Sequence, residues 1–183
     1  MFPNGGADLA NYLYFSLNRR LATELATQNC TAEAEGTPKK STSVFISGAV
    51  ESRLRMLIPY LDVWPQAMAL FALPQNSPEA LNNLKTLCDD IWFHAGDRST
   101  DFNWYTKRVL LAGIYKSTEL YMLQDQSEDF HATFAFMDRR MSDLQIMGKC
   151  ARKMQFGSDN IGDVLFGGMH VIRNILGAND AKR

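Results

Sequence analysis

Two pairs of side chains in this sequence have the types and spacing of metal ligands. Glu128 and His131 form an E-x-x-H pair on one helical face, half of the motif that carboxylate-bridged di-iron bundles use twice. Asp90 and His94 are four residues apart and suit a shared metal ion. The sequence has no second E-x-x-H, and no third or fourth metal ligand lies at a suitable distance from Asp90 and His94 along the chain. Both pairs are therefore better explained as solvent-exposed helix residues than as metal ligands. Phosphate-loop, nucleophile-elbow and zinc-protease motifs are also missing, and we expect no catalytic residue, no metal and no cofactor.

A different chemistry is indicated by "HAGDRSTDFNWYTKR", His94 to Arg108, which surrounds two aromatic rings with charged and hydroxyl groups. Residues 99–101 offer three successive N-cap candidates for a long helix, which explains part of this polarity. Trp104 lies on the apolar stripe of that helix and could be the end of the core. Tyr105 and Arg108 lie off the stripe and are neighbours on the helix surface. Since Tyr, Trp and Arg dominate binding energy at interfaces, we predict surface recognition here, with core packing as the alternative.

The elements that must position these residues are predicted to be helices. Apolar spacing is helical nearly everywhere, without the two-residue alternation of strands, so the fold class is all-α with about seven helices. We expect a buried central helix where residues 109–115 are apolar around the whole circumference. We also expect Ser77 and Ser127 to cap helices. The expected helices cover residues 8–27, 44–60, 65–73, 77–96, about 101–124, from 127 onward, and 159–176, with a long flexible loop after the first.

Composition narrows the class of protein. The chain has 183 residues, 46% of them hydrophobic and 21% charged, with a net charge of -1 that disfavours non-specific nucleic-acid binding. Its three cysteines are far apart with no CxxC, which indicates neither a disulfide framework nor a zinc knuckle and fits a reducing compartment. No apolar run approaches the ~18 residues of a spanning helix. The first fifteen residues lack the pattern of a targeting segment, and we expect none there.

The content of 11 Phe and 9 Met suits a deep apolar cavity for an isoprenoid or acyl chain. Ordinary filling of the core is the alternative, and composition does not decide between them. The residues expected to line such a cavity are Leu57, Met68, Leu87, Ile114, Tyr115, Phe134 and Met137.

The last expected helix, residues 159–176, is amphipathic. Its three glycines make it marginal unless its apolar face is covered, either by the core of the domain or by a bilayer interface. We predict that it detaches from the domain and contacts a membrane. The contacting residues are expected to be Ile161, Val164, Leu165, Met169, Ile172, Ile175 and Leu176.

Four runs carry a resemblance to a known family: "DDIWFHAGDRSTDFNWYTKR", "ESRLRMLIPY", "WPQAMALFALPQN" and "TELYMLQDQSEDF". Together they closely resemble the lipid-binding accessory proteins of mitochondrial coenzyme Q biosynthesis, the partners of the demethoxyubiquinone hydroxylase. That family has the fold of TetR-type regulators. The opening "MFPNGGADL" is similar to the end of the TetR helix-turn-helix, so we expect the chain to begin partway through the family's domain.

The resemblance implies a TetR-regulator-like helical lipid-binding domain over residues 1–157, followed by an amphipathic helix and tail over 158–183. It implies a non-enzymatic homodimer on the matrix side of the mitochondrial inner membrane, held there peripherally. Its ligand would be an isoprenoid quinone or a phospholipid, and nucleic acid would not bind. The family's partner patch corresponds here to Ile91, Asp101, Trp104, Tyr105 and Arg108, where the family often has Met in place of Ile91.

Two other functions compete with this one. The chain could be the ligand-sensing half of a TetR-like transcriptional regulator, which would require a recognition helix that this sequence does not contain. A di-iron enzyme would require a second E-x-x-H.

Overall fold

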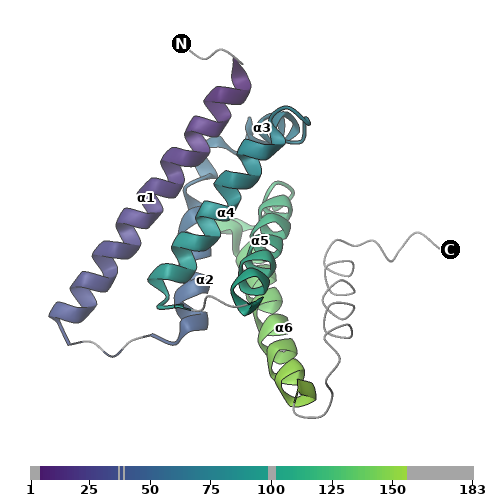
Figure 1. Cartoon of the computed structure of the whole chain (residues 1–183). Coiled ribbons are helices and arrows are strands. Elements are labelled where there is room, and N and C mark those ends of the chain that lie inside the picture. Colours follow the sequence, from purple (N-terminus) through teal and green to yellow (C-terminus); the bar gives the residue numbers. More distant parts are fainter. Residues whose placement is uncertain (1–4, 37, 39, 99–101, 156–183) are drawn as a thin grey trace. The chain divides into compact units, whose positions relative to one another are not determined.

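The computed structural model describes residues 5–36, 38, 40–98 and 102–155, with side chains described through Asp143 except at positions 102 and 103. Regular structure in these residues is entirely helical, with six α-helices and two short 3-10 helices, which confirms the all-α fold class (Figure 1). The chain divides into two compact units, Met1–Ala112 and Gly113–Arg183, with the boundary inside α5.

The first unit is organised around one long helix. It contains α1 (Gly6–Ala34), α2 (Thr42–Arg55), η1 (Ile58–Tyr60), α3 (Trp64–Phe71), α4 (Ser77–His94) and the first half of α5 (Phe102–Met122). Helix α1 packs against α2, α3 and α4, and Figure 1 shows α1 and α4 side by side. Its buried face carries Tyr14, Leu17, Leu21 and Leu25 at helical spacing. The rings of Tyr14, Trp64 and Phe71 pack with centroids 6.0 to 6.2 Å apart, which anchors α3 to α1.

Polar side chains are also buried between α1, α2 and α4. Asn18 Nδ2 donates to the Asn83 carbonyl at 2.8 Å, and Asn18 Oδ1 accepts from Arg53 Nε at 3.0 Å. Asn83 Nδ2 donates to Asn11 Oδ1 at 3.3 Å, and Asn11 Nδ2 donates to a Glu79 oxygen at 3.1 Å. Because these bonds are directional, they fix how α1 slides and rotates against its neighbours more strictly than apolar packing would.

The second unit contains the rest of α5, η2 (Glu128–Phe130) and α6 (His131–Gln155). The helix predicted from Ser127 onward begins only at His131, because Asp129 and Phe130 have positive φ in the 3-10 turn before it. Ser127 still serves as a cap, since its Oγ accepts from the Ala132 amide at 3.0 Å. A second cap comes from Asp125, which accepts from the Ser127 amide and from the amide and hydroxyl of Thr133. These bonds hold the pKa of Asp125 well below its ordinary value, the Thr133 hydroxyl contributing most. Phe134, Met137 and Met141 are buried on one stripe of α6, as their spacing predicts, but Phe130, predicted on the same stripe, is half-buried in η2 before α6 begins.

Several local predictions are wrong. Helix α1 extends into the predicted loop as far as Ala34, since no Gly or Pro interrupts it and the hydroxyls of Thr27 and Thr31 bond to carbonyls one turn back. Ser77 is the first helical residue of α4 and not its cap; the cap position is Asn76. Val109 is 55% exposed, so the predicted buried central helix is not covered on all sides at that end.

The predicted amphipathic helix and all seven predicted membrane-contact residues lie outside the described residues, so both stay predictions, as does the domain boundary at 157. Of the helices that the structure describes, none has the length and apolarity to cross a membrane.

Candidate docking surface

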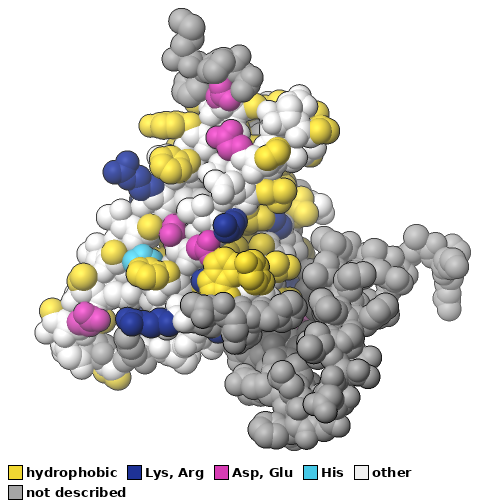
Figure 2. All heavy atoms as spheres, viewed as in Figure 1, with side chains coloured by type: hydrophobic (Ala, Val, Ile, Leu, Met, Phe, Trp, Pro, Cys, Tyr) yellow, Lys and Arg dark blue, Asp and Glu magenta, His cyan; other side chains and the backbone are white. Residues whose placement is uncertain are grey.

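An exposed aromatic pair lies at the start of α5. Tyr105 is 64% exposed, Trp104 is half-buried, and their rings meet edge to face with centroids 4.7 Å apart. Val109 follows Tyr105 by one helical turn and is also exposed, as is Phe93 near the end of α4. Figure 2 shows hydrophobic side chains gathered near the start of α5, with acidic and basic side chains close by. We call Trp104, Tyr105 and Val109 the aromatic patch.

Arg108 supports the patch from within the first unit. Its guanidinium carbon lies 4.0 Å from the centroid of the Trp104 ring, a cation–π contact. Its Nε donates to Asp89 Oδ1, and one terminal nitrogen donates to Asp97 Oδ2 at 3.3 Å and to the Trp104 carbonyl at 3.2 Å. Arg108 is only 8% exposed. Two carboxylates pair with its buried charge, and the flat face of its guanidinium packs on the indole of Trp104.

Asp97 joins the end of α4 to the start of α5. Lys107 Nζ donates to Asp97 Oδ1 at 2.7 Å and lies 5.3 Å from the centroid of the Trp92 ring. Trp92 Nε1 in turn donates to the Lys107 carbonyl at 3.3 Å. Gly96 ends α4 with a φ of +86°, a conformation that suits glycine, and the Asp97 amide then bonds back to the Trp92 carbonyl at 3.0 Å. The turn thereby directs the Asp97 carboxylate toward α5.

Burial raises the pKa values of two groups beside this network. Desolvation raises the pKa of the Cys88 thiol to about 12, with a further rise from Asp89 and an opposing effect of Arg108. Desolvation also raises the pKa of Asp90. His94 lowers this pKa and Asp89 raises it further. The Cys88 thiol is therefore a packing group and not a nucleophile at neutral pH.

The predicted partner-binding residues differ from one another in how exposed they are. Tyr105 is exposed, Trp104 is half-buried, Arg108 is buried in the ionic network, and Ile91 is 1% exposed. Asp101 lies outside the described residues. The partner-binding assignment itself stays a prediction for all five.

Sequence reasoning missed four residues of this region. Phe93 lies on the side of α4 opposite the stripe of Leu84, Cys88 and Ile91, and helical spacing could have identified it. Val109 was missed because it belongs to an apolar run that predicts burial. Asp89 and Asp97 gave no local signal, since they meet Arg108 from 19 and 11 residues away along the chain.

The residues predicted to line a lipid cavity are divided between the two units. In the first unit Leu57 and Leu87 are buried and Met68 is half-buried. In the second, Ile114, Tyr115, Phe134 and Met137 are buried. The cavity stays a prediction.

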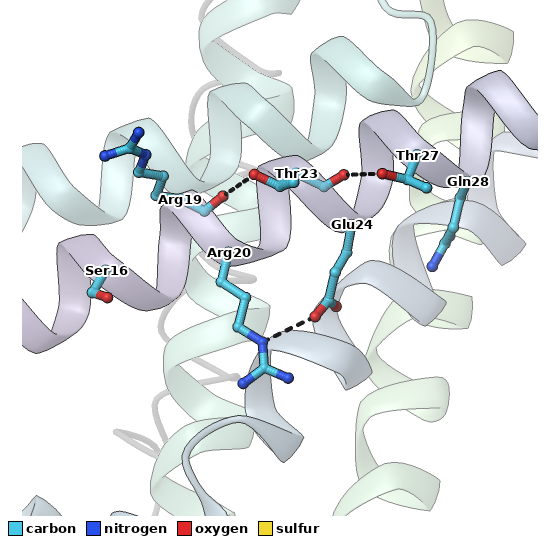
Figure 3. Close-up of a pocket in the computed structure, with 7 residues that line it drawn as sticks. All are labelled: Ser16, Arg19, Arg20, Thr23, Glu24, Thr27 and Gln28. Atoms are coloured by element: carbon cyan, nitrogen blue, oxygen red, sulfur yellow. Dashed lines mark hydrogen bonds and ion pairs between the residues drawn. The ribbon is translucent and has the colours of Figure 1, made fainter.

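Two shallow hollows of the first unit lie away from these residues. One, of about 690 Å³, follows the polar side of α1 (Figure 3). There the Arg20 guanidinium pairs with Glu24, and the Thr23 and Thr27 hydroxyls donate to backbone carbonyls, so these polar groups are engaged locally. The other, of about 470 Å³, lies where Tyr12 and Phe15 of α1 meet α4. Across the described residues, no three His, Cys, Asp or Glu side chains gather in a way that would hold a metal ion.

Comparison with known proteins shows which proteins this chain is similar to. A family model described as COQ9 matches residues 77–148, which include α4, α5 and the aromatic patch. Over 182 residues the chain is 41% identical to "Ubiquinone biosynthesis protein COQ9, mitochondrial" of Rattus norvegicus, covering 100% of this chain and 58% of that relative. The chain is therefore similar to COQ9 proteins.

Other COQ9 relatives agree. The protein of the same name from Homo sapiens is 39% identical over 182 residues, covering 100% of this chain and 57% of the relative. That from Drosophila melanogaster is 44% identical over 150 residues, covering 80% of this chain and 45% of the relative. This chain thus spans between 45% and 58% of the length of the three relatives described.

Proposed function

We propose that this chain is a non-catalytic lipid-binding protein of mitochondrial ubiquinone biosynthesis. In this proposal it binds an isoprenoid quinone precursor and presents it to the demethoxyubiquinone hydroxylase. It acts as a homodimer held peripherally on the matrix side of the inner membrane. Support for the pathway comes from the names of the COQ9 relatives, which describe them as mitochondrial ubiquinone biosynthesis proteins.

The observation that carries the docking part is the exposure of Tyr105 beside the half-buried Trp104 at the start of α5. An exposed Tyr side chain at 64% leaves most of its ring for a partner, and its edge-to-face contact with Trp104 keeps the two rings in one arrangement. Large aromatic rings with few rotatable bonds give much contact area at low entropic cost. The aromatic patch therefore has the properties of an interface core.

The lipid part is supported by the apolar, sulfur-rich side chains that the helices bury. Met122, Met137 and Met141 are buried in the second unit together with Phe134. Thioether side chains adapt their shape at low cost, which suits a flexible isoprenoid chain. A presenting protein needs only to bind the precursor and the enzyme, so this function requires no acid, base or nucleophile of its own.

A reconstituted presentation assay tests the proposal. The full chain, loaded with a demethoxyubiquinone analogue and identified as a complex by native mass spectrometry, is mixed with the hydroxylase, and product formation is compared with that from analogue in vesicles alone. We expect faster product formation with the loaded chain. We also expect Tyr105→Ala to retain the analogue and lose the acceleration. A chain that retains no analogue, or that gives no acceleration when loaded, contradicts the proposal.

A further inference from the structure

We infer that Asp97 and Asp89 are positioning residues for the aromatic patch: their carboxylates hold Arg108 against Trp104 and so arrange the aromatic pair before a partner arrives. This inference rests on the proposed docking function. It assigns to these two acidic side chains a role in binding that acts through the residues they hold.

The bonds of Arg108 form a clamp. Asp89 accepts from Nε, while Asp97 and the Trp104 carbonyl accept from one terminal nitrogen. Acceptors on two sides of a planar guanidinium fix both its position and its plane. An arginine without them would exchange among many rotamers and would leave the indole 4.0 Å away without a fixed support.

The clamp also restricts the exposed ring of Tyr105, through Trp104. Trp104 packs on Arg108 and is half-buried, and Tyr105 meets Trp104 edge to face. Binding costs less when the contacting side chains already have their bound arrangement, because fewer rotamers are lost on association. The clamp therefore favours binding through Trp104 and Tyr105.

The position of Asp97 excludes much direct contact with a partner. Its side chain is 7% exposed, with Oδ1 accepting from Lys107 and Oδ2 accepting from Arg108. Asp89 is more accessible, at 31% of its side chain, but its Oδ1 also accepts from Arg108. An effect of Asp97 on affinity must thus pass through the residues that it holds.

A double-mutant cycle on the full chain tests this inference, with the hydroxylase affinity measured by interferometry. We expect Asp97→Asn to weaken binding about tenfold in the wild-type background. In the Trp104→Ala background the same substitution should change affinity less than about twofold, because the ring that the clamp supports is gone. Asp89→Asn changes a second, more exposed residue of the same clamp and should show the same coupling to Trp104. It replaces Asp97→Asn in the cycle if that variant does not fold. Glu51→Gln, which removes an ion pair with Arg55 on α2, is the control and should leave affinity unchanged.

The outcomes separate the inference from the proposed function. If Trp104→Ala leaves affinity unchanged, the docking function fails and the inference fails with it. If Trp104→Ala weakens binding but both aspartate variants bind like the wild type, only the positioning role is overturned. The positioning role is also overturned if the aspartate substitutions weaken binding equally in both backgrounds, since that result would mean that they act independently of the indole.

Discussion

Asn18→Ala should be among the most damaging polar substitutions in the first unit. Asn18 is 4% exposed on α1 and bridges two other helices. Its amide nitrogen donates to the Asn83 carbonyl at 2.8 Å, and its oxygen accepts from Arg53 Nε at 3.0 Å. Alanine removes both bonds, and the space it leaves lies among buried groups where water has little access.

The expected loss of stability follows from these two bonds. A neutral buried hydrogen bond contributes about 1 kcal/mol, and one to a charged donor about 1.5 to 3 kcal/mol. We therefore expect Asn18→Ala to lower the free energy of unfolding by about 3 kcal/mol, which reduces the ratio of folded to unfolded protein more than a hundredfold. Small domains have about 5 to 15 kcal/mol in total, so this loss is large.

Urea denaturation followed by circular dichroism at neutral pH measures the loss. Thr23→Ala on the same helix is the control: Thr23 is exposed, and its hydroxyl bonds to the Arg19 carbonyl one turn back. Its substitution should change the unfolding free energy by less than about 0.5 kcal/mol. If Asn18→Ala shifts the midpoint no further than Thr23→Ala does, the buried polar contacts do not stabilise the packing of α1, and our account of this unit is wrong.

Three further predictions concern the ends of the helices and the cysteines. Because the pKa of Asp125 is lowered in the folded state, the stability that this carboxylate contributes is present above its unfolded-state pKa of about 4 and is lost gradually as the pH falls from there toward the lower folded-state pKa. Asp125→Asn should therefore be less stable than the wild type at neutral pH, and urea titrations should show this deficit shrinking steadily below about pH 4. Gly96→Ala should lower the unfolding free energy by about 1 kcal/mol through its positive φ alone, since a Cβ there meets no atom within 4 Å; an unchanged urea midpoint would contradict this. In iodoacetamide labelling read by peptide mass spectrometry, exposed Cys30 should react in the native protein and buried Cys88 only after unfolding; equal rates would contradict the burial of Cys88.

Much of the helical framework could be predicted from the sequence, because apolar spacing reports directly on which face of a helix is buried. Among the five α4 residues whose spacing predicts one buried stripe, Leu84, Cys88 and Ile91 are buried, whereas Leu81 is 64% exposed and Trp92 is half-buried. Gly96 ends the turn that follows. The stripe of Phe134, Met137 and Met141 on α6 is buried as well. The length of α1 was underestimated, because residues with weak helix propensity remain helical where no Gly or Pro breaks the chain.

The candidate site was harder to predict, because side chains distant in the chain determine it. Helical spacing predicts Tyr105 and Arg108 as neighbours on the exposed surface of α5, but only Tyr105 is exposed there. The structure buries Arg108 because Asp89 and Asp97 reach it from α4 and the turn after α4. Only the tertiary arrangement brings these carboxylates to the guanidinium, and no local pattern reports that arrangement.

The most direct test of the proposed docking function compares two tyrosines of nearly equal exposure in their affinity for the hydroxylase. Tyr105 is 64% exposed in the aromatic patch, and Tyr12 is 61% exposed on α1. We predict that Tyr105→Ala weakens binding about thirtyfold, as truncation of an interface anchor typically does, while Tyr12→Ala binds like the wild type and both variants keep the wild-type melting temperature. Equal affinities for the two variants, or a Tyr105→Ala protein that binds as well as the wild type, would contradict the assignment of this surface to the hydroxylase.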